Sequence, residues 1–136
     1  MSAFTNKILP LLFIVLLNVL LPACVNSEEI ESISQTELLT KIQTKQPPLI
    51  LDVRSKHEYD SGHIPGAINI SFERLDDRID RIDRHKNSTV VVYCERGFRA
   101  RVAETTLNQA GFTSILHLEG DMSQWRTNSL PIEESS

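Results

Sequence analysis

Cysteine, histidine and basic residues are all scarce in this sequence, and each scarcity excludes a class of protein. The 136 residues include two cysteines, too few for a small scaffold built on disulfides. His57, His85 and His117 lie far apart and have no zinc-site spacing with Cys94, so no metal or other cofactor is expected. Acidic residues outnumber basic ones by 18 to 14, and this balance argues against a nucleic-acid partner.

A long apolar run occurs at the N-terminus, where Ile8 to Leu21 follows Lys7. A membrane-spanning helix needs about 20 apolar residues, so this shorter run better suits the core of a signal peptide. It leads into Leu21-Pro22-Ala23-Cys24, which resembles a bacterial lipobox. We therefore predict a signal peptide over 1–23, lipid attached to Cys24, and export to the periplasm or cell envelope with anchoring to a membrane. Ordinary cleavage near Ala23 and an uncleaved anchor are the alternatives, and both also place the domain outside the cytoplasm.

Short apolar strands alternate with helical segments through the rest of the chain, which is typical of an α/β protein. We predict a polar tether over 24–32, one domain over 33–127 and a polar tail over 128–136. Capping-box spacing at Ser34 and Ser55 marks two helix starts. The architecture expected is a mainly parallel central sheet with helices on both faces, in which ligands bind beyond the carboxyl ends of the strands. Strands are predicted near Ile33 and over 49–53, 67–70, 89–93 and 114–118.

One further helix is expected to begin at Ser71. Apolar residues then recur at helical spacing, at Phe72, Leu75, Ile79 and Ile82. The remaining positions of this segment carry charges of both signs, which indicates a solvated surface.

The segment with the clearest chemical signal surrounds Cys94. An apolar, β-branched run, 89–93, ends in this cysteine, a short loop follows, and 100–109 has the pattern of a helix. A strand, a tight loop and a helix N-terminus form an anion site, because loop N–H groups and the helix dipole point at one spot. Such a site favours a thiolate, the nucleophilic form of cysteine. The alternative is a buried, unreactive cysteine at the end of a strand.

Several ordered motifs resemble those of single-domain rhodaneses, a family of sulfurtransferases. The resemblance implies a rhodanese-like fold in which Cys94 accepts a sulfane sulfur as a persulfide and passes it to a thiophilic acceptor such as cyanide or a thiol. The sequence differs from the usual pattern at Ala100, often serine or threonine, and at Asp121, usually a second glycine. The matching segments are 51–54, 58–59, 62–70, 91–94, 97–100 and 120–125.

We call residues 94–100 the cysteine loop, and expect its backbone N–H groups to surround the sulfur. Gly97 allows the loop to turn where a side chain would obstruct it. Arg96 and Arg99 could attract a small anionic donor such as thiosulfate, and Arg99, which closes the loop, ranks above Arg96. The Glu95 side chain is expected to face outward. The substrate-binding residues predicted are Glu95, Arg96, Gly97, Phe98, Arg99 and Ala100.

Asp52 and Arg54 follow an earlier strand, and we expect them to brace the cysteine loop or to pair with Glu58. Phosphatases and arsenate reductases place five residues between their cysteine and arginine, whereas four separate Cys94 from Arg99 here. The shorter loop suits one sulfur atom better than a phosphate. A non-catalytic persulfide carrier remains possible, because it would use the same cysteine. The oligomeric state is not predicted.

Overall fold

The computed structural model describes residues 29–44 and 47–135. The predicted signal peptide, Cys24 and most of the predicted tether lie outside these residues. Among the residues that the structure describes, no helix is long and apolar enough to cross a membrane.

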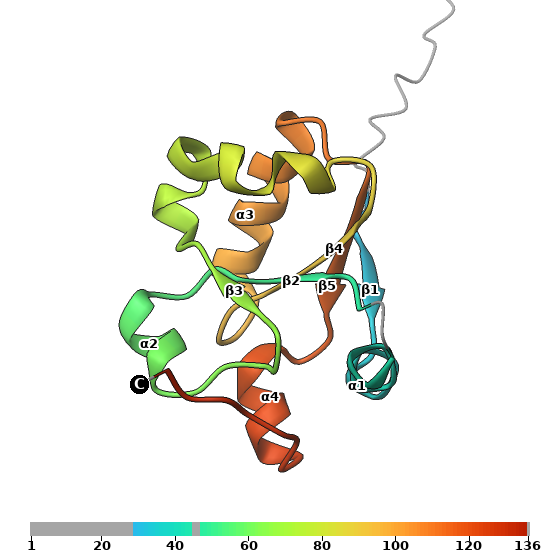
Figure 1. Ribbon diagram of the computed structural model, residues 1–136, viewed down its shortest axis with the longest axis vertical. Helices are drawn as coiled ribbons and strands as arrows, with labels where there is room; N and C mark the ends of the chain where they lie inside the picture. Colours follow the sequence, from blue (N-terminus) through green and yellow to red (C-terminus); the bar gives the residue numbers. More distant parts are fainter. Residues whose placement is uncertain (1–28, 45–46, 136) are drawn as a thin grey trace, which may run out of the picture.

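A five-stranded parallel sheet forms the centre of the domain (Figure 1). Its strands lie in the order β1-β5-β4-β2-β3, and every neighbouring pair is parallel. The predicted mainly parallel sheet is therefore confirmed. The strands are β1 (Glu31–Ile33), β2 (Leu49–Asp52), β3 (Ile68–Asn69), β4 (Thr89–Tyr93) and β5 (Ser114–Leu118).

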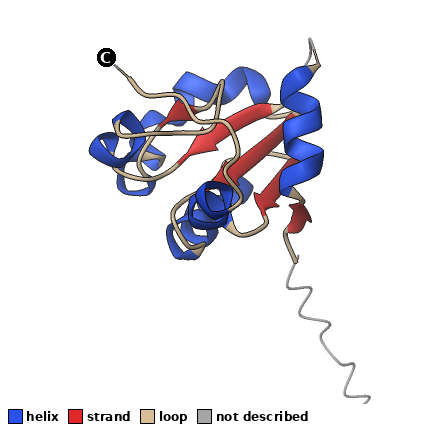
Figure 2. Cartoon of the chain, turned by 90° about the horizontal axis from the view of Figure 1, so that it is seen from below, coloured by secondary structure: helices blue, strands red, loops and turns tan. Residues whose placement is uncertain are grey.

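Helices cover both faces of the sheet (Figure 2). The helices are α1 (Gln35–Gln43), α2 (Lys56–Asp60), α3 (Phe98–Gln109) and α4 (Asp121–Thr127). Successive side chains of a strand point to opposite faces, so a strand with apolar residues throughout contributes to a core on each face. Val90 and Val92 pack in a core with side chains of α3, whereas Val91 and Tyr93 pack in a second core with side chains of α1 and α4.

The segment predicted as a helix from Ser71 differs from expectation. It forms two 3₁₀ segments, η1 (Phe72–Arg74) and η2 (Asp76–His85), and the Ser71 side chain makes no capping hydrogen bond. Aspartate is a weak helix former and η2 contains four, which favours the tighter turns. Two of the predicted apolar positions, Leu75 and Ile82, are nevertheless buried in the core.

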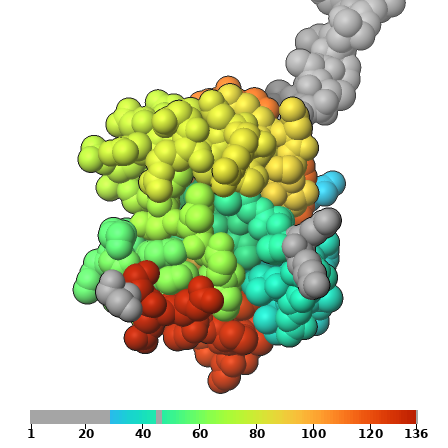
Figure 3. Space-filling view, viewed as in Figure 1, coloured from blue at the N-terminus to red at the C-terminus, as the bar shows by residue number. Residues whose placement is uncertain are grey.

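The C-terminal segment lies against the region around α2 (Figure 3). His63 and Glu133 exchange backbone hydrogen bonds of 2.8 and 2.9 Å, and the Ser135 N–H donates to the Asp60 carbonyl. The predicted polar tail thus bonds to the end of α2 and to the bend that follows it.

Candidate active site

Cys94 directly follows β4 and lies at the carboxyl end of the sheet. Its side chain is a free thiol, and the residue is 1% exposed. The Gly97 N–H donates a hydrogen bond to Cys94 Sγ over 3.0 Å. Gly97 has φ +99°, a conformation that L side chains rarely adopt, and α3 begins at the next residue. The backbone therefore turns so that an amide donor meets the sulfur.

The first turn of α4 donates backbone hydrogen bonds to two carbonyl groups of the cysteine loop. Met122 N–H donates to the Cys94 carbonyl over 3.0 Å, and Ser123 N–H donates to the Glu95 carbonyl over 3.1 Å. These are amides that a helix N-terminus leaves without partners inside the helix. Because the two carbonyl oxygens bond to α4, the loop can present the Gly97 N–H to the sulfur.

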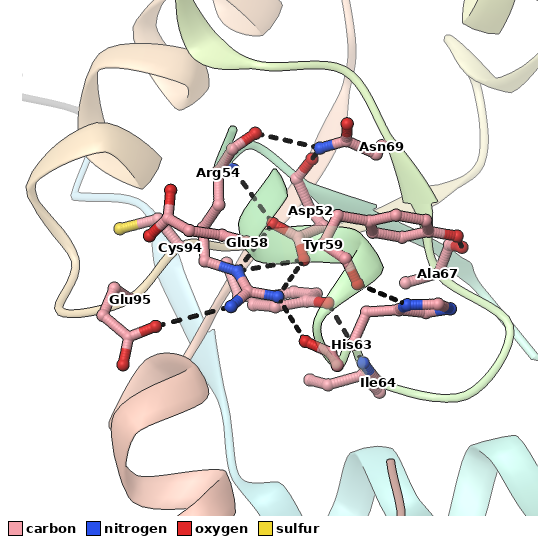
Figure 4. A network of polar contacts seen from close by, with 12 residues as sticks. Asp52, Arg54, Glu58, Tyr59, His63, Ile64, Ala67, Asn69, Cys94 and Glu95 are labelled. Carbon is pink, nitrogen blue, oxygen red and sulfur yellow. Dashed lines mark hydrogen bonds and ion pairs between the residues drawn. The ribbon is translucent and has the colours of Figure 1, made fainter. Parts of the chain in front are cut away.

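Arg54 connects the end of β2, the bend at Gly62 and the cysteine loop (Figure 4). It is fully buried and bonds to the Asp52 carboxylate at 2.7 Å, to the Gly62 carbonyl at 2.7 Å and to Glu95 Oε2 at 3.4 Å. A buried charge needs such partners to offset its loss of hydration. Asp52 and Arg54 thus have the contacts expected of bracing residues, but neither pairs with Glu58.

The Glu95 side chain, which was expected to face outward, is partly exposed and is paired with two arginines. Its carboxylate bonds to Arg126 of α4 at 2.6 and 3.2 Å, in addition to its contact with Arg54. The sequence could not show this pairing, because Arg126 lies 31 positions away.

Arg99 is the ion-pair partner of Glu58. Two guanidinium N–H groups donate to the two Glu58 oxygens over 2.6 and 2.8 Å. This pairing lowers the pKa of Glu58 from 4.5 to about 2. The pKa of Arg99 is raised, chiefly by Glu58 and to a smaller degree by Cys94, so Arg99 remains cationic near the sulfur.

The other predicted loop residues lie in different surroundings. Arg96 is exposed and lines a shallow hollow with the first residues of α4. Phe98 is 76% exposed at the rim, whereas Ala100 is buried in the core beneath the loop. The structure therefore brings Gly97 and Arg99 close to the sulfur and directs Arg96 and Phe98 outward.

Sequence reasoning missed a buried polar cluster behind the loop, formed by Glu104, His117 and Asp121. His117 donates from Nδ1 to Glu104 and from Nε2 to Asp121, the second over 3.2 Å. The two carboxylates, Asp121 first, raise the pKa of His117 to about 10. The departure from glycine at Asp121 was the available signal. In the described part of the chain, no three or more His, Cys, Asp or Glu side chains are grouped so that they could hold a metal ion.

Comparison with known families matches residues 34–128 to the rhodanese-like domain. The chain is 28% identical over 100 residues to the putative sulfur carrier protein YrkF of Bacillus subtilis, in an alignment covering 74% of this chain and 53% of that protein. It is 33% identical over 108 residues to the HTH-type transcriptional regulator Rv0324 of Mycobacterium tuberculosis, covering 78% of this chain and 46% of the regulator. The chain thus spans about half the length of these two relatives.

A solved structure shows the same architecture. The rhodanese-like domain protein from Staphylococcus aureus superposes with a TM-score of 0.69 and 28% identity, covering 79% of this chain and all of that one. The predicted rhodanese-like α/β fold is therefore confirmed.

Proposed function

The chain belongs to the rhodanese-like domain family, and from this premise we propose that it is a sulfurtransferase that carries sulfur as a persulfide on Cys94. The family relates the chain to sulfur transfer in general, and the donor and acceptor are part of the proposal. The observation that supports it most is the Gly97 N–H, directed at Cys94 Sγ over 3.0 Å. An amide in that position stabilises anionic sulfur in both the thiolate and the persulfide.

With thiosulfate as donor, the Cys94 thiolate attacks the outer sulfur. A new S–S bond forms while the bond between the two thiosulfate sulfurs breaks, and sulfite leaves with the electron pair of that bond. Cyanide then attacks the terminal sulfur of the persulfide, thiocyanate leaves, and the Cys94 thiolate is restored. Neither step requires an oxidant, a reductant or a cofactor. Both steps keep one negative charge on the sulfur of the enzyme, next to the Gly97 amide.

The geometry gives less support to phosphoryl chemistry. An arginine that binds a phosphate in a cysteine loop must present its guanidinium to the anion. Here four residues rather than five separate Cys94 from Arg99, so the loop leaves less room for a phosphate between the sulfur and the guanidinium.

A persulfide carrier is the second candidate function. The name of the Bacillus subtilis relative, a putative sulfur carrier protein, favours it. A carrier would accept sulfur once and release it only to a partner protein, whereas the proposed enzyme turns over with small molecules. The test is steady-state thiocyanate formation from thiosulfate and cyanide. We expect repeated turnover that Cys94→Ser abolishes without changing the circular dichroism spectrum. Sulfur loading without turnover would favour the carrier, and full turnover by Cys94→Ser would overturn the proposal.

We also propose that the protein is exported and anchored through lipid on Cys24, with residues 1–23 removed and 24–32 acting as a tether. The apolar run followed by Leu21-Pro22-Ala23-Cys24 supports this proposal. Each buried methylene of an acyl chain contributes about 0.8 kcal/mol to membrane binding, so several chains on one cysteine suffice. Cys24→Ser should move the protein from the membrane fraction to a soluble one or block its processing. A mature N-terminus elsewhere, without acyl mass on Cys24, would leave only an ordinary signal peptide.

A further inference from the structure

Asp121 is the residue whose side chain reaches the backbone of the reactive cysteine. Its Oδ1 accepts a hydrogen bond from the Cys94 N–H over 2.8 Å, within the buried interior. Its Oδ2 lies 3.1 Å from the point where a Cβ on Gly97 would stand. One carboxylate therefore bonds to the first residue of the cysteine loop and lies beside the glycine that donates to the sulfur.

The carboxylate is itself fixed from the far side. His117 donates from Nε2 to Asp121 Oδ2 over 3.2 Å and from Nδ1 to Glu104. The side chains of Glu104 and Asp121 are 4% and 5% exposed, and that of His117 is 19% exposed. An imidazolium with two carboxylate partners has both ring nitrogens engaged, which restricts the Asp121 carboxylate to one orientation.

The backbone at this position is a poor one for aspartate. Asp121 has φ +51°, in the left-handed region where glycine incurs no steric cost and other residues do. Glycine would fit this backbone better, so an aspartate here indicates that its side chain makes a contact that offsets the steric cost. Here the contacts made by the carboxylate supply the compensating interaction.

We propose that Asp121 is a positioning residue for sulfur transfer, fixed by His117 and Glu104 so that the Cys94 N–H is bonded and the Gly97 N–H stays directed at the sulfur. The proposal rests on the sulfurtransferase function proposed above. Without the carboxylate, the buried Cys94 N–H lacks its acceptor, and a buried unpaired donor destabilises the arrangement around it. The loop would then sample positions in which the Gly97 amide no longer meets the sulfur.

Two substitutions separate this role from a merely structural one. Asp121→Gly removes the carboxylate while suiting the positive φ, so the domain should fold. Asp121→Asn keeps an oxygen acceptor for the Cys94 N–H and replaces the charge with an amide, which can donate to neutral His117. If the hydrogen bond from the Cys94 N–H to residue 121 positions the loop, Asp121→Asn should load sulfur from thiosulfate at nearly the wild-type rate. Asp121→Gly should be about 10-fold slower or more, the effect of losing a hydrogen bond to a charged group.

Hydrogen exchange of the Cys94 amide, followed by NMR, provides a readout that does not depend on sulfur transfer. Protection should persist in Asp121→Asn and be lost in Asp121→Gly, while the pKa of His117 should fall in both. Equal loading rates in Asp121→Gly and wild type, or an Asp121→Asn variant as slow as Asp121→Gly, would overturn the proposal. If the wild-type protein loads no sulfur, the proposed function fails. The positioning role is then decided by amide exchange and by the rate at which iodoacetamide alkylates Cys94.

Discussion

Replacing Arg99 with alanine should weaken the binding of an anionic sulfur donor far more than replacing Arg96. Arg99 lies close to Cys94, and Glu58 fixes its guanidinium through two bonds of 2.6 and 2.8 Å. A guanidinium has five N–H donors, so about three remain for a ligand. Arg96 carries the same charge but is exposed.

The magnitude follows from the interaction that is removed. A hydrogen bond to a charged group contributes about 1.5–3 kcal/mol, which corresponds to a rise in KM for thiosulfate of about 10- to 150-fold. The value of kcat should change less, because the donor is bound before the sulfur moves. Glu58→Gln keeps an oxygen acceptor and should raise KM less than Arg99→Ala does.

The assay is thiocyanate formation over a range of thiosulfate concentrations, with kcat and KM determined separately. Arg96→Ala serves as the matched control for the loss of one positive charge, and circular dichroism confirms folding. An unchanged KM in Arg99→Ala, or equal increases in both variants, would show that backbone amides alone bind the donor and would refute the reasoning.

Three further predictions concern pH and specificity. The folded-state pKa of Glu58, about 2, lies below its usual 4.5, so the stability contributed by its pair with Arg99 is complete above pH 4.5 and is lost as the pH falls through about 2. Thermal melts between pH 2 and 7 should therefore show a shallower acid slope for Glu58→Gln than for wild type, and parallel slopes would contradict this. The pKa of His117 is raised from 6.5 to about 10, so its contribution is complete below pH 6.5 and is lost as the pH rises through about 10. His117→Gln should lower the melting temperature at pH 7 and by less at pH 10, and an equal difference at both would speak against a charged His117. Finally, p-nitrophenyl phosphate should not be hydrolysed, and robust Cys94-dependent release of p-nitrophenol would favour a phosphatase instead.

The positions of the strands along the chain and the position of Cys94 could be predicted because both depend on local patterns. Apolar runs such as 89–93 and turn residues such as Gly97 are visible in the sequence without knowledge of the fold. The same applies to the capping box at Ser55, which the structure contains with both of its hydrogen bonds.

Pairings between distant charged residues could not be predicted in this way. The sequence offers many acidic residues to Arg99, and only the packing of α2 beside the cysteine loop selects Glu58, 41 positions away. Glu95 joins Arg126 for the same reason. His117 resembled an isolated histidine, because Glu104 lies 13 positions away on α3, and Asp121, four positions away, meets it only through the turn between β5 and α4.

The measurement that tests the central claim most directly is the intact mass of the protein after incubation with thiosulfate, followed by peptide mapping. The account predicts a gain of one sulfur atom on the peptide that contains Cys94, its absence in Cys94→Ser, and its removal by cyanide with release of thiocyanate. A wild-type mass that does not change, or a sulfur atom found on a peptide without Cys94, would contradict it.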